Sequence, residues 1–298
     1  MKRILGLAFV LLVAVGGLYL AQHKKRADAV SADAVVDMAA DWQRDVTRAP
    51  MHFTRISDEQ ETKIGDELAR VYVSEQSAQS AEARATEQYV NEVGGRIAAH
   101  AKRKLNYRFH LINEANLINA FALPGGHIFI GQGLLDQMTS EDELAFILGH
   151  ELEHIDHYHA VERVQIDAKL KSVNLEIVSE IAQIPMSLWQ AGYSKDQEFE
   201  ADREGLRLAV AAGYSPQGAV KMTEKLMKLD REYVIHAETP TGELSQAAID
   251  GLTGYFRSHP QPSERLQQVN DVIAQDHLPK DQPLKPFHIE YEVTSSGK

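Results

Sequence analysis

The residues with the clearest chemical potential in this chain are those at positions 150 to 154, His-Glu-Leu-Glu-His. His150 and His154 are four residues apart, which on a helix places two side chains on one face, one turn apart. Two imidazoles in that arrangement can bind one zinc ion. Glu151 would then lie beside the first ligand, where it can act as general base toward a water on the metal. The pentapeptide therefore predicts a catalytic metal site.

A helix that begins after Ser140 is predicted to carry these residues. Ser140 and Glu143 form a capping box, and Glu141 and Asp142 are favourable in the first turn. An apolar stripe at helical spacing follows, formed by Leu144, Ile147, Leu148, Leu152 and Ile155. The two histidines thus lie in a segment suited to burial, where a metal would satisfy both rings. The alternative is a pair of core histidines bonded to backbone carbonyls.

The third metal ligand must be His, Asp or Glu, because the chain contains no cysteine. The best candidate is Glu198, which falls in the first turns of a helix that Ser194 and Gln197 would cap. Asp202 shares its face and can accept the other N–H of a ligand histidine, which would fix the ring orientation. Glu200 is the rival ligand but points to another face. An acidic, solvated helix start is the remaining interpretation of this segment.

Five sequence segments in a fixed order extend this site: residues 119–130, 140–154, 159–163, 193–202 and 258–265. Together they resemble the CAAX-prenyl-protease and HtpX-like family of gluzincin zinc metallopeptidases, in its single-anchor exported bacterial form. The resemblance implies a zinc-dependent endopeptidase in which Glu198 joins His150 and His154 on the metal. Glu151 would be the base. The expected fold is α+β and mainly α-helical, a zincin-like metallopeptidase with a small sheet.

The resemblance also implies a substrate-binding edge strand in that sheet. Its candidate residues are Asn119, Ala120 and Phe121. The free backbone N–H and C=O groups of an edge strand can pair with an extended peptide. The alternative is an ordinary turn at residues 124–126, Pro-Gly-Gly, before a buried hairpin strand.

The late Ser-His-Pro segment supplies a further candidate catalytic residue, His259. The resemblance implies that His259 lies near the zinc. There it would either stabilise an oxyanion or occupy the open coordination position in a closed, inactive state. Tyr255 and Arg265 compete for the oxyanion role.

The histidines just after the second ligand are not assigned to the catalytic metal. His157 is expected to support the site or lie at the surface, in preference to binding a second metal. His159, Glu162 and Arg163 are expected to form a surface network on a continuation of the same helix.

The chain opens with an apolar segment at residues 4–21 that has basic residues on both flanks. We expect residues 1–26 to form a membrane anchor, with a cleaved export signal as the alternative. Residues 27–50 are expected to be a linker, 51–278 the metallopeptidase domain, and 279–298 an extended tail. Resemblance to exported bacterial proteins favours the cell envelope, with the domain tethered to the inner membrane or exported to the periplasm.

The remaining sequence predicts secondary structure around the site. Further helices are expected to open at residues 57–59 and to span 83–101, 216–227 and 262–274, with short strands at 107–112 and 128–130. Residues 164–193 predict an amphipathic helix that packs on the core, with a lid or a membrane contact as alternatives.

The formal net charge of −12 disfavours nucleic acid as a partner. The expected partners are protein or peptide substrates, together with a membrane contacted through the N-terminal segment. Exported relatives suggest unfolded or misassembled envelope proteins as substrates. The competing hypothesis is a non-catalytic chaperone or adaptor for envelope proteins with a metal-stabilised fold. A third is a closed structural metal site with His259 as fourth ligand.

Overall fold

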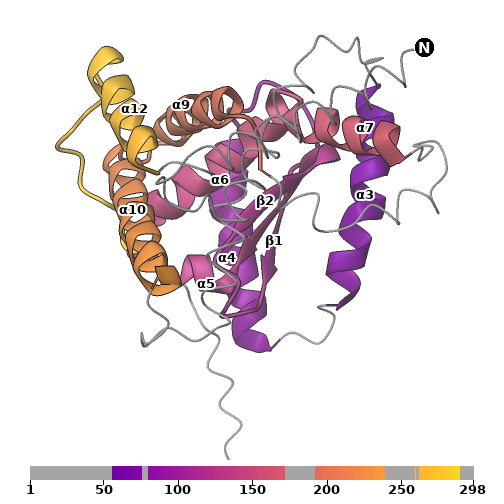
Figure 1. Ribbon diagram of the computed structural model, residues 1–298, viewed down its shortest axis with the longest axis horizontal. Helices are drawn as coiled ribbons and strands as arrows, with labels where there is room; N and C mark the ends of the chain where they lie inside the picture. Colours follow the sequence, from indigo (N-terminus) through magenta and orange to yellow (C-terminus); the bar gives the residue numbers. More distant parts are fainter. Residues whose placement is uncertain (1–55, 76–79, 172–191, 239–258, 260–261, 289–298) are drawn as a thin grey trace, which may run out of the picture. The chain divides into compact units, whose positions relative to one another are not determined.

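The computed structural model describes residues 56–75, 80–171, 192–238, 259 and 262–288 of the chain. Its main elements are α3 Asp58–Glu75, α4 Ala81–Ala98, β1 Arg108–Ile112, β2 Ala120–Leu123, β3 His127–Gly131, α6 Glu141–Asp156, α7 His159–Lys171, α9 Lys195–Ala211, α10 Gln217–Glu238 and α12 Pro262–Gln275 (Figure 1). A 3-10 turn, Pro124–Gly126, and a short helix, α5 Gln132–Leu135, complete the series. The predicted α+β, mainly α-helical fold is confirmed.

The N-terminal segment and the linker predicted at residues 1–50 lie outside the described residues. Residues 172–191, which are part of the predicted amphipathic helix, also lie outside them. Within the described ranges, no helix combines the length and the apolar character that crossing a bilayer requires.

The three strands form a mixed sheet in the order β1–β3–β2. β1 runs parallel to β3, and β2 runs antiparallel to β3 with Phe121 opposite Phe129. Among the described strands, β2 therefore pairs on one side only and forms an edge. The turn at Pro124–Gly126 makes this tight reversal possible, because Gly125 and Gly126 have φ values of 76° and 101° that favour glycine.

Helices cover both faces of the sheet because its side chains alternate between two apolar clusters. Ala120 and Ala122 of β2 lie in the larger cluster, with residues of α4 and α6. Phe121 and Leu123 lie in the smaller cluster, which contains Ile64, Leu68 and Ala69 of α3. The sheet is thus held between α4 and α6 on one side and α3 on the other, with α6 next to the edge strand.

The helix that bears the two histidines is buried along its whole length. Both predicted capping boxes are present: Ser140 with Glu143 at the start of α6, and Ser194 with Gln197 at the start of α9. The first turn of α6 is also bound by a late part of the chain. Glu141 N donates to the carbonyl of Lys285 at 2.8 Å, and Lys285 N donates to Asp142 Oδ2 at 2.5 Å.

Glycines bring the backbones of α6 and α9 into direct contact. A Cβ atom at Gly205 of α9 would lie 2.6 Å from the backbone nitrogen of His150, closer than real Cβ contacts allow. A Cβ atom at Gly149 of α6 would lie 2.7 Å from the carbonyl oxygen of Gly205. This close crossing lets a carboxylate on α9 reach the histidines of α6.

The helix that carries the histidines ends sooner than the sequence suggested. α6 ends at Asp156, Tyr158 adopts a left-handed conformation with φ of 64°, and α7 begins at His159. Arg103 stabilises the break: its Nη1 donates to the carbonyl of Ile155 at 2.8 Å, and its guanidinium lies over the Tyr158 ring. The expectation of one continuous helix is therefore wrong, since long-range contacts from Arg103 terminate it.

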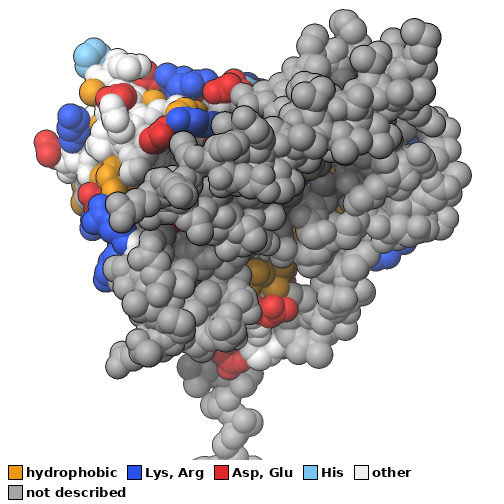
Figure 2. Space-filling model, viewed as in Figure 1, with side chains coloured by type: hydrophobic (Ala, Val, Ile, Leu, Met, Phe, Trp, Pro, Cys, Tyr) orange, Lys and Arg blue, Asp and Glu red, His pale blue; other side chains and the backbone are white. Residues whose placement is uncertain are grey.

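On the face where α12 reaches the surface, acidic, basic and apolar side chains are interspersed (Figure 2). Ion pairs join α12 to its neighbour α9, since Arg207 Nε lies 2.6 Å from Asp276 Oδ2 just past the end of α12. These exposed contacts help to fix α9 from the outside.

Candidate metal centre

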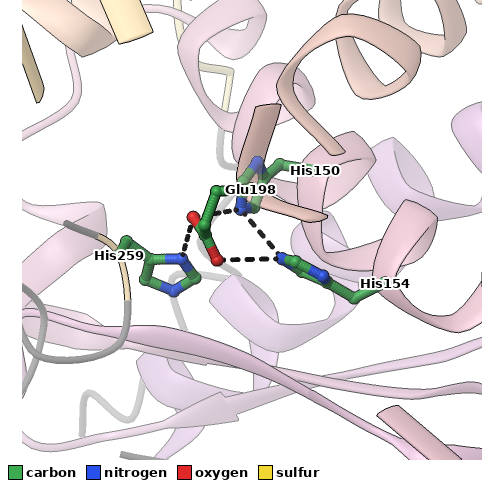
Figure 3. Close-up of side chains that lie close together, drawn as sticks. All are labelled: His150, His154, Glu198 and His259. Carbon is green, nitrogen blue, oxygen red and sulfur yellow. Dashed lines mark hydrogen bonds and ion pairs between the residues drawn. The ribbon is translucent and has the colours of Figure 1, made fainter. Parts of the chain in front are cut away.

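The three predicted metal ligands converge in the interior of the protein (Figure 3). The Nε2 atoms of His150 and His154 are 3.2 Å apart. Glu198 Oε1 lies 3.4 Å from His154 Nε2, and Glu198 Oε2 lies 3.6 Å from His150 Nε2. All three side chains are at most 1% exposed. Glu198, 44 positions after His154, thus places its carboxylate beside the two imidazole nitrogens.

This donor set fits a divalent metal ion. Donors around a tetrahedral zinc at about 2.0–2.1 Å lie roughly 3.3–3.4 Å apart, close to the three separations observed. Among the described residues, Glu198 Oε1 has no hydrogen-bond partner although it is buried. Burial alone would raise the pKa of Glu198, but His259, His150 and His154 hold it well below its usual range. The carboxylate is therefore charged and ready to bind a cation.

A second carboxylate orients the first histidine. Asp202 Oδ1 lies 2.9 Å from His150 Nδ1, the contact on which the predicted role of Asp202 depends. Arg265 of α12 binds both oxygens of Asp202, with Nε to Oδ2 and Nη2 to Oδ1 each at 2.7 Å. The fully buried Arg265 thus holds Asp202 in place, which leaves His150 Nε2 directed toward His154 Nε2 and Glu198. Arg265 was predicted as a rival oxyanion donor, yet the structure places it on Asp202.

Two residues that contact His154 were missed in the sequence. Tyr193 stacks on the His154 ring with the ring centres 3.7 Å apart. His159 Nδ1 lies 3.1 Å from His154 Nδ1, and His159 is only 5% exposed. The expected surface network at His159 is therefore wrong, because the break at Tyr158 turns this residue inward.

Burial, with His157 nearby, lowers the pKa of His159 to about 3. The neutral His159 ring can therefore accept the Nδ1–H of His154 when His154 Nε2 holds a metal. His159 then performs for His154 the orienting task that Asp202 performs for His150. The sequence did contain a signal for this role, because His159 follows His154 by five residues. On one continuous helix, however, the His159 side chain would have pointed away from His154.

The predicted base lies beside the donor group. Glu151 is 1% exposed, and among the described residues its Oε2 has no hydrogen-bond partner. Burial raises the pKa of Glu151 above its usual value. A carboxylate with a raised pKa is suited both to accept a proton from water and to return it later.

His259 lies on the opposite side of Glu198 from His154 (Figure 3). Its Nδ1 is 2.9 Å from Glu198 Oε2, and its Nε2 is 3.6 Å from Glu151 Oε1. The same Nε2 lies 3.5 Å from the carbonyl oxygen of Ala120. His259 can therefore supply a fourth donor to the group formed by His150, His154 and Glu198. Tyr255 lies outside the described residues.

The predicted substrate-binding residues surround the free edge of β2. Asn119 immediately precedes the strand, and its carbonyl accepts from Gly131 N of β3 at 2.9 Å. Ala120 and Phe121 belong to β2 itself. Since Asn119 bonds toward β3, the backbone of Ala120 points the other way, and its carbonyl faces His259. Glu200, the rival metal ligand, lies apart from this group and contacts His157 and His159.

The site combines two histidines one helical turn apart, an adjacent buried acid and a glutamate from a later helix. This is the arrangement expected of a metallopeptidase of the gluzincin class. The profile of Peptidase family M48 matches residues 84–273, more than half of the chain. The chain belongs to this family, which confirms the resemblance drawn from the sequence.

Three relatives illustrate the likeness. The chain is 26% identical over 202 residues to the beta-barrel assembly-enhancing protease of Yersinia pestis, covering 60% of this chain and 41% of that protein. It is 26% identical over 237 residues to metalloprotease LoiP of Escherichia coli, and the match covers 75% of this chain and 84% of LoiP. It is 23% identical over 306 residues to mitochondrial metalloendopeptidase OMA1 of Schizosaccharomyces pombe, and the match covers 97% of this chain and 78% of OMA1. The chain thus matches less than half of the Yersinia pestis relative's length.

Proposed function

We propose that this protein is a zinc-dependent endopeptidase that hydrolyses peptide bonds in unfolded or misassembled envelope proteins. The observation that carries the proposal is the buried group of His150, His154 and Glu198 with Glu151 beside it. The names of two relatives, a beta-barrel assembly-enhancing protease and a metalloprotease, support the substrate class and the activity. A catalytic function is favoured over a chaperone or adaptor because a binding protein has no need of the buried acid.

A zinc ion held by His150, His154 and Glu198 would polarise the peptide carbonyl and make a nearby water more acidic. Glu151 accepts the proton of the attacking water and then delivers it to the nitrogen of the leaving amine. Asp202 and His159 keep the ligand rings in position during both steps, through the hydrogen bonds described above.

The edge of β2 is the proposed binding surface for the substrate backbone. Asn119, Ala120 and Phe121 run past the donor group, and the carbonyl of Ala120 is directed away from β3. An extended peptide added along this edge would place a scissile bond near Glu151. A location in the bacterial cell envelope, with residues 1–26 as anchor or export signal, completes the proposal.

Removal of the metal should abolish peptidase activity. We expect chelator-treated protein to lose hydrolysis of a fluorescent casein and one equivalent of zinc per chain to restore it. Glu198→Gln should reduce metal affinity at least about tenfold, since a neutral amide replaces the charged ligand, whereas Glu200→Gln is the matched control that keeps the tightly bound ion. Metal content by mass spectrometry and casein hydrolysis provide the readouts. Full activity in metal-free protein would exclude the proposed function.

His259 is proposed to hold a closed resting state. Its ring lies against Glu198, Glu151 and the Ala120 carbonyl, which are the groups that a substrate must approach. We expect His259→Ala to increase the initial rate of peptide hydrolysis, about tenfold if the closed state is favoured by about 1.4 kcal/mol. A fall in rate with unchanged zinc content would instead assign His259 to oxyanion stabilisation.

A further inference from the structure

A second cluster of metal-ligating side chains lies next to the catalytic group. His157, at the end of α6, His159, at the start of α7, and Glu200, on α9, direct one donor atom each toward a common position. His157 Nδ1 lies 3.3 Å from Glu200 Oε1, and His159 Nε2 lies 3.5 Å from Glu200 Oε2. The break at Tyr158 creates the cluster because it turns the two histidines toward α9.

Two donor separations in this cluster are similar to those of the catalytic group. Its two nitrogen-to-oxygen separations of 3.3 and 3.5 Å compare with 3.4 and 3.6 Å between Glu198 and its histidines. Imidazole nitrogens with one carboxylate suit zinc and its neighbours among the late transition metals. The side chain of Glu200 is 36% exposed and that of His157 is 22% exposed, so an ion can reach the cluster from solvent.

A buried acid is positioned to support metal binding by His157. Glu153 Oε2 lies 3.1 Å from His157 Nε2, the ring nitrogen that faces away from the cluster. Glu153 is fully buried, and neither of its oxygens accepts a hydrogen bond of good geometry among the described residues. A ligand histidine commonly donates its second N–H to a carboxylate in this way. Lys102 Nζ, 3.3 Å from the same nitrogen, and Arg203 Nη2, 3.7 Å from Glu200 Oε1, supply positive charge nearby.

We propose that His157, His159 and Glu200 form a second site for a divalent transition-metal ion such as Zn²⁺, and that filling this site inhibits the enzyme. The interpretation of His157 drawn from the sequence, which favoured a supporting or surface role, is thereby revised. The metal-binding part of the proposal is independent of catalysis, whereas the inhibition rests on the proposed peptidase function.

Inhibition follows from the hydrogen bond between His159 and His154. When His154 Nε2 holds the catalytic metal, the proton of its neutral ring is on Nδ1 and is donated to His159 Nδ1, 3.1 Å away. Neutral His159 must then carry its own proton on Nε2. A metal on His159 Nε2 forces that proton to Nδ1, so that two N–H groups face each other. The second ion therefore removes the bond that orients His154.

The test is a zinc titration of the full-length, untagged protein that has first been loaded with one equivalent of zinc. Equilibrium dialysis should detect a second, weaker equivalent in the wild type. Neither His157→Ala nor Glu200→Gln should bind it, although both retain the first equivalent. His100→Ala, which removes an exposed histidine elsewhere, is the matched control and should bind both. Two variants on different elements guard against loss of binding through misfolding.

Peptidase activity should fall as the second equivalent binds, about tenfold or more, the range typical for losing a residue that orients a ligand. His157→Ala should keep full activity at zinc concentrations that inhibit the wild type. The second site is refuted if the wild type binds no second equivalent of zinc. It is also refuted if both His157→Ala and Glu200→Gln still bind the second equivalent. Binding of the second ion with no loss of activity overturns the inhibition. Because dialysis counts ions directly, an inactive protein would refute the proposed function while leaving the metal site testable.

Discussion

Replacement of Glu151 by glutamine is expected to abolish peptide hydrolysis while the protein retains one tightly bound zinc ion. The amide has nearly the same shape, but it cannot accept the proton of the attacking water or return it to the leaving amine. Loss of a general base typically lowers rates by about 10²–10⁴-fold. Because Glu151 is not among the donors around His150, His154 and Glu198, the metal content should not change. Casein hydrolysis and metal analysis on the same preparation measure both effects.

The same substitution at Glu153, two residues later on α6 and equally buried, is the matched control. Glu153→Gln should keep most of the activity, because Glu153 contacts His157 and not the catalytic group. The competing chaperone hypothesis predicts that Glu151→Gln still protects misfolded envelope proteins in cells. If the Glu151→Gln and wild-type proteins were indistinguishable in cells, the adaptor function would replace the peptidase.

The second large effect is expected at the crossing of α6 and α9. Gly205→Ala places a methyl group 2.6 Å from the backbone nitrogen of His150, so the two helices must move apart. We expect this overpacking to lower the free energy of unfolding by about 1–3 kcal/mol. We also expect weaker zinc binding, since Glu198 moves away from both histidines. Urea unfolding and zinc affinity are the two measurements.

Gly95→Ala in α4 is the matched control, because a Cβ atom there meets no heavy atom within 4 Å. Alanine is the better helix former, so this variant should gain about 0.5–1 kcal/mol of stability. The difference between the two variants isolates the steric contact from helix propensity. If Gly205→Ala proved as stable as Gly95→Ala and bound zinc normally, the close crossing would not position the metal site.

The parts of the site that could be predicted from the sequence are those governed by local rules. Capping boxes located the starts of α6 and α9, and the four-residue spacing placed His150 and His154 on one face. The same spacing on α9 identified Asp202 as a partner for a ligand histidine. Each of these inferences needs only residues within one or two helical turns.

The parts that could not be predicted depend on contacts between distant segments. Neither glycine nor proline marks the end of α6; Arg103, more than fifty residues earlier, stabilises the break at Tyr158. Nor does any local pattern show that Arg265 binds Asp202 or that Tyr193 stacks on His154. The second histidine cluster results from that same break, which explains why spacing along one continuous helix could not reveal it.

The two backbone hydrogen bonds that Lys285 makes to the first turn of α6 have a consequence for biosynthesis. Lys285 is translated after the four donors of the metal-binding group and after the adjacent acid, which are His150, His154, Glu198, His259 and Glu151. A nascent chain therefore lacks these two hydrogen bonds to the start of α6 until Lys285 has been added. We therefore expect the first turn of α6, and with it the helix that carries both histidines, to reach its final geometry only after Lys285 has been synthesised.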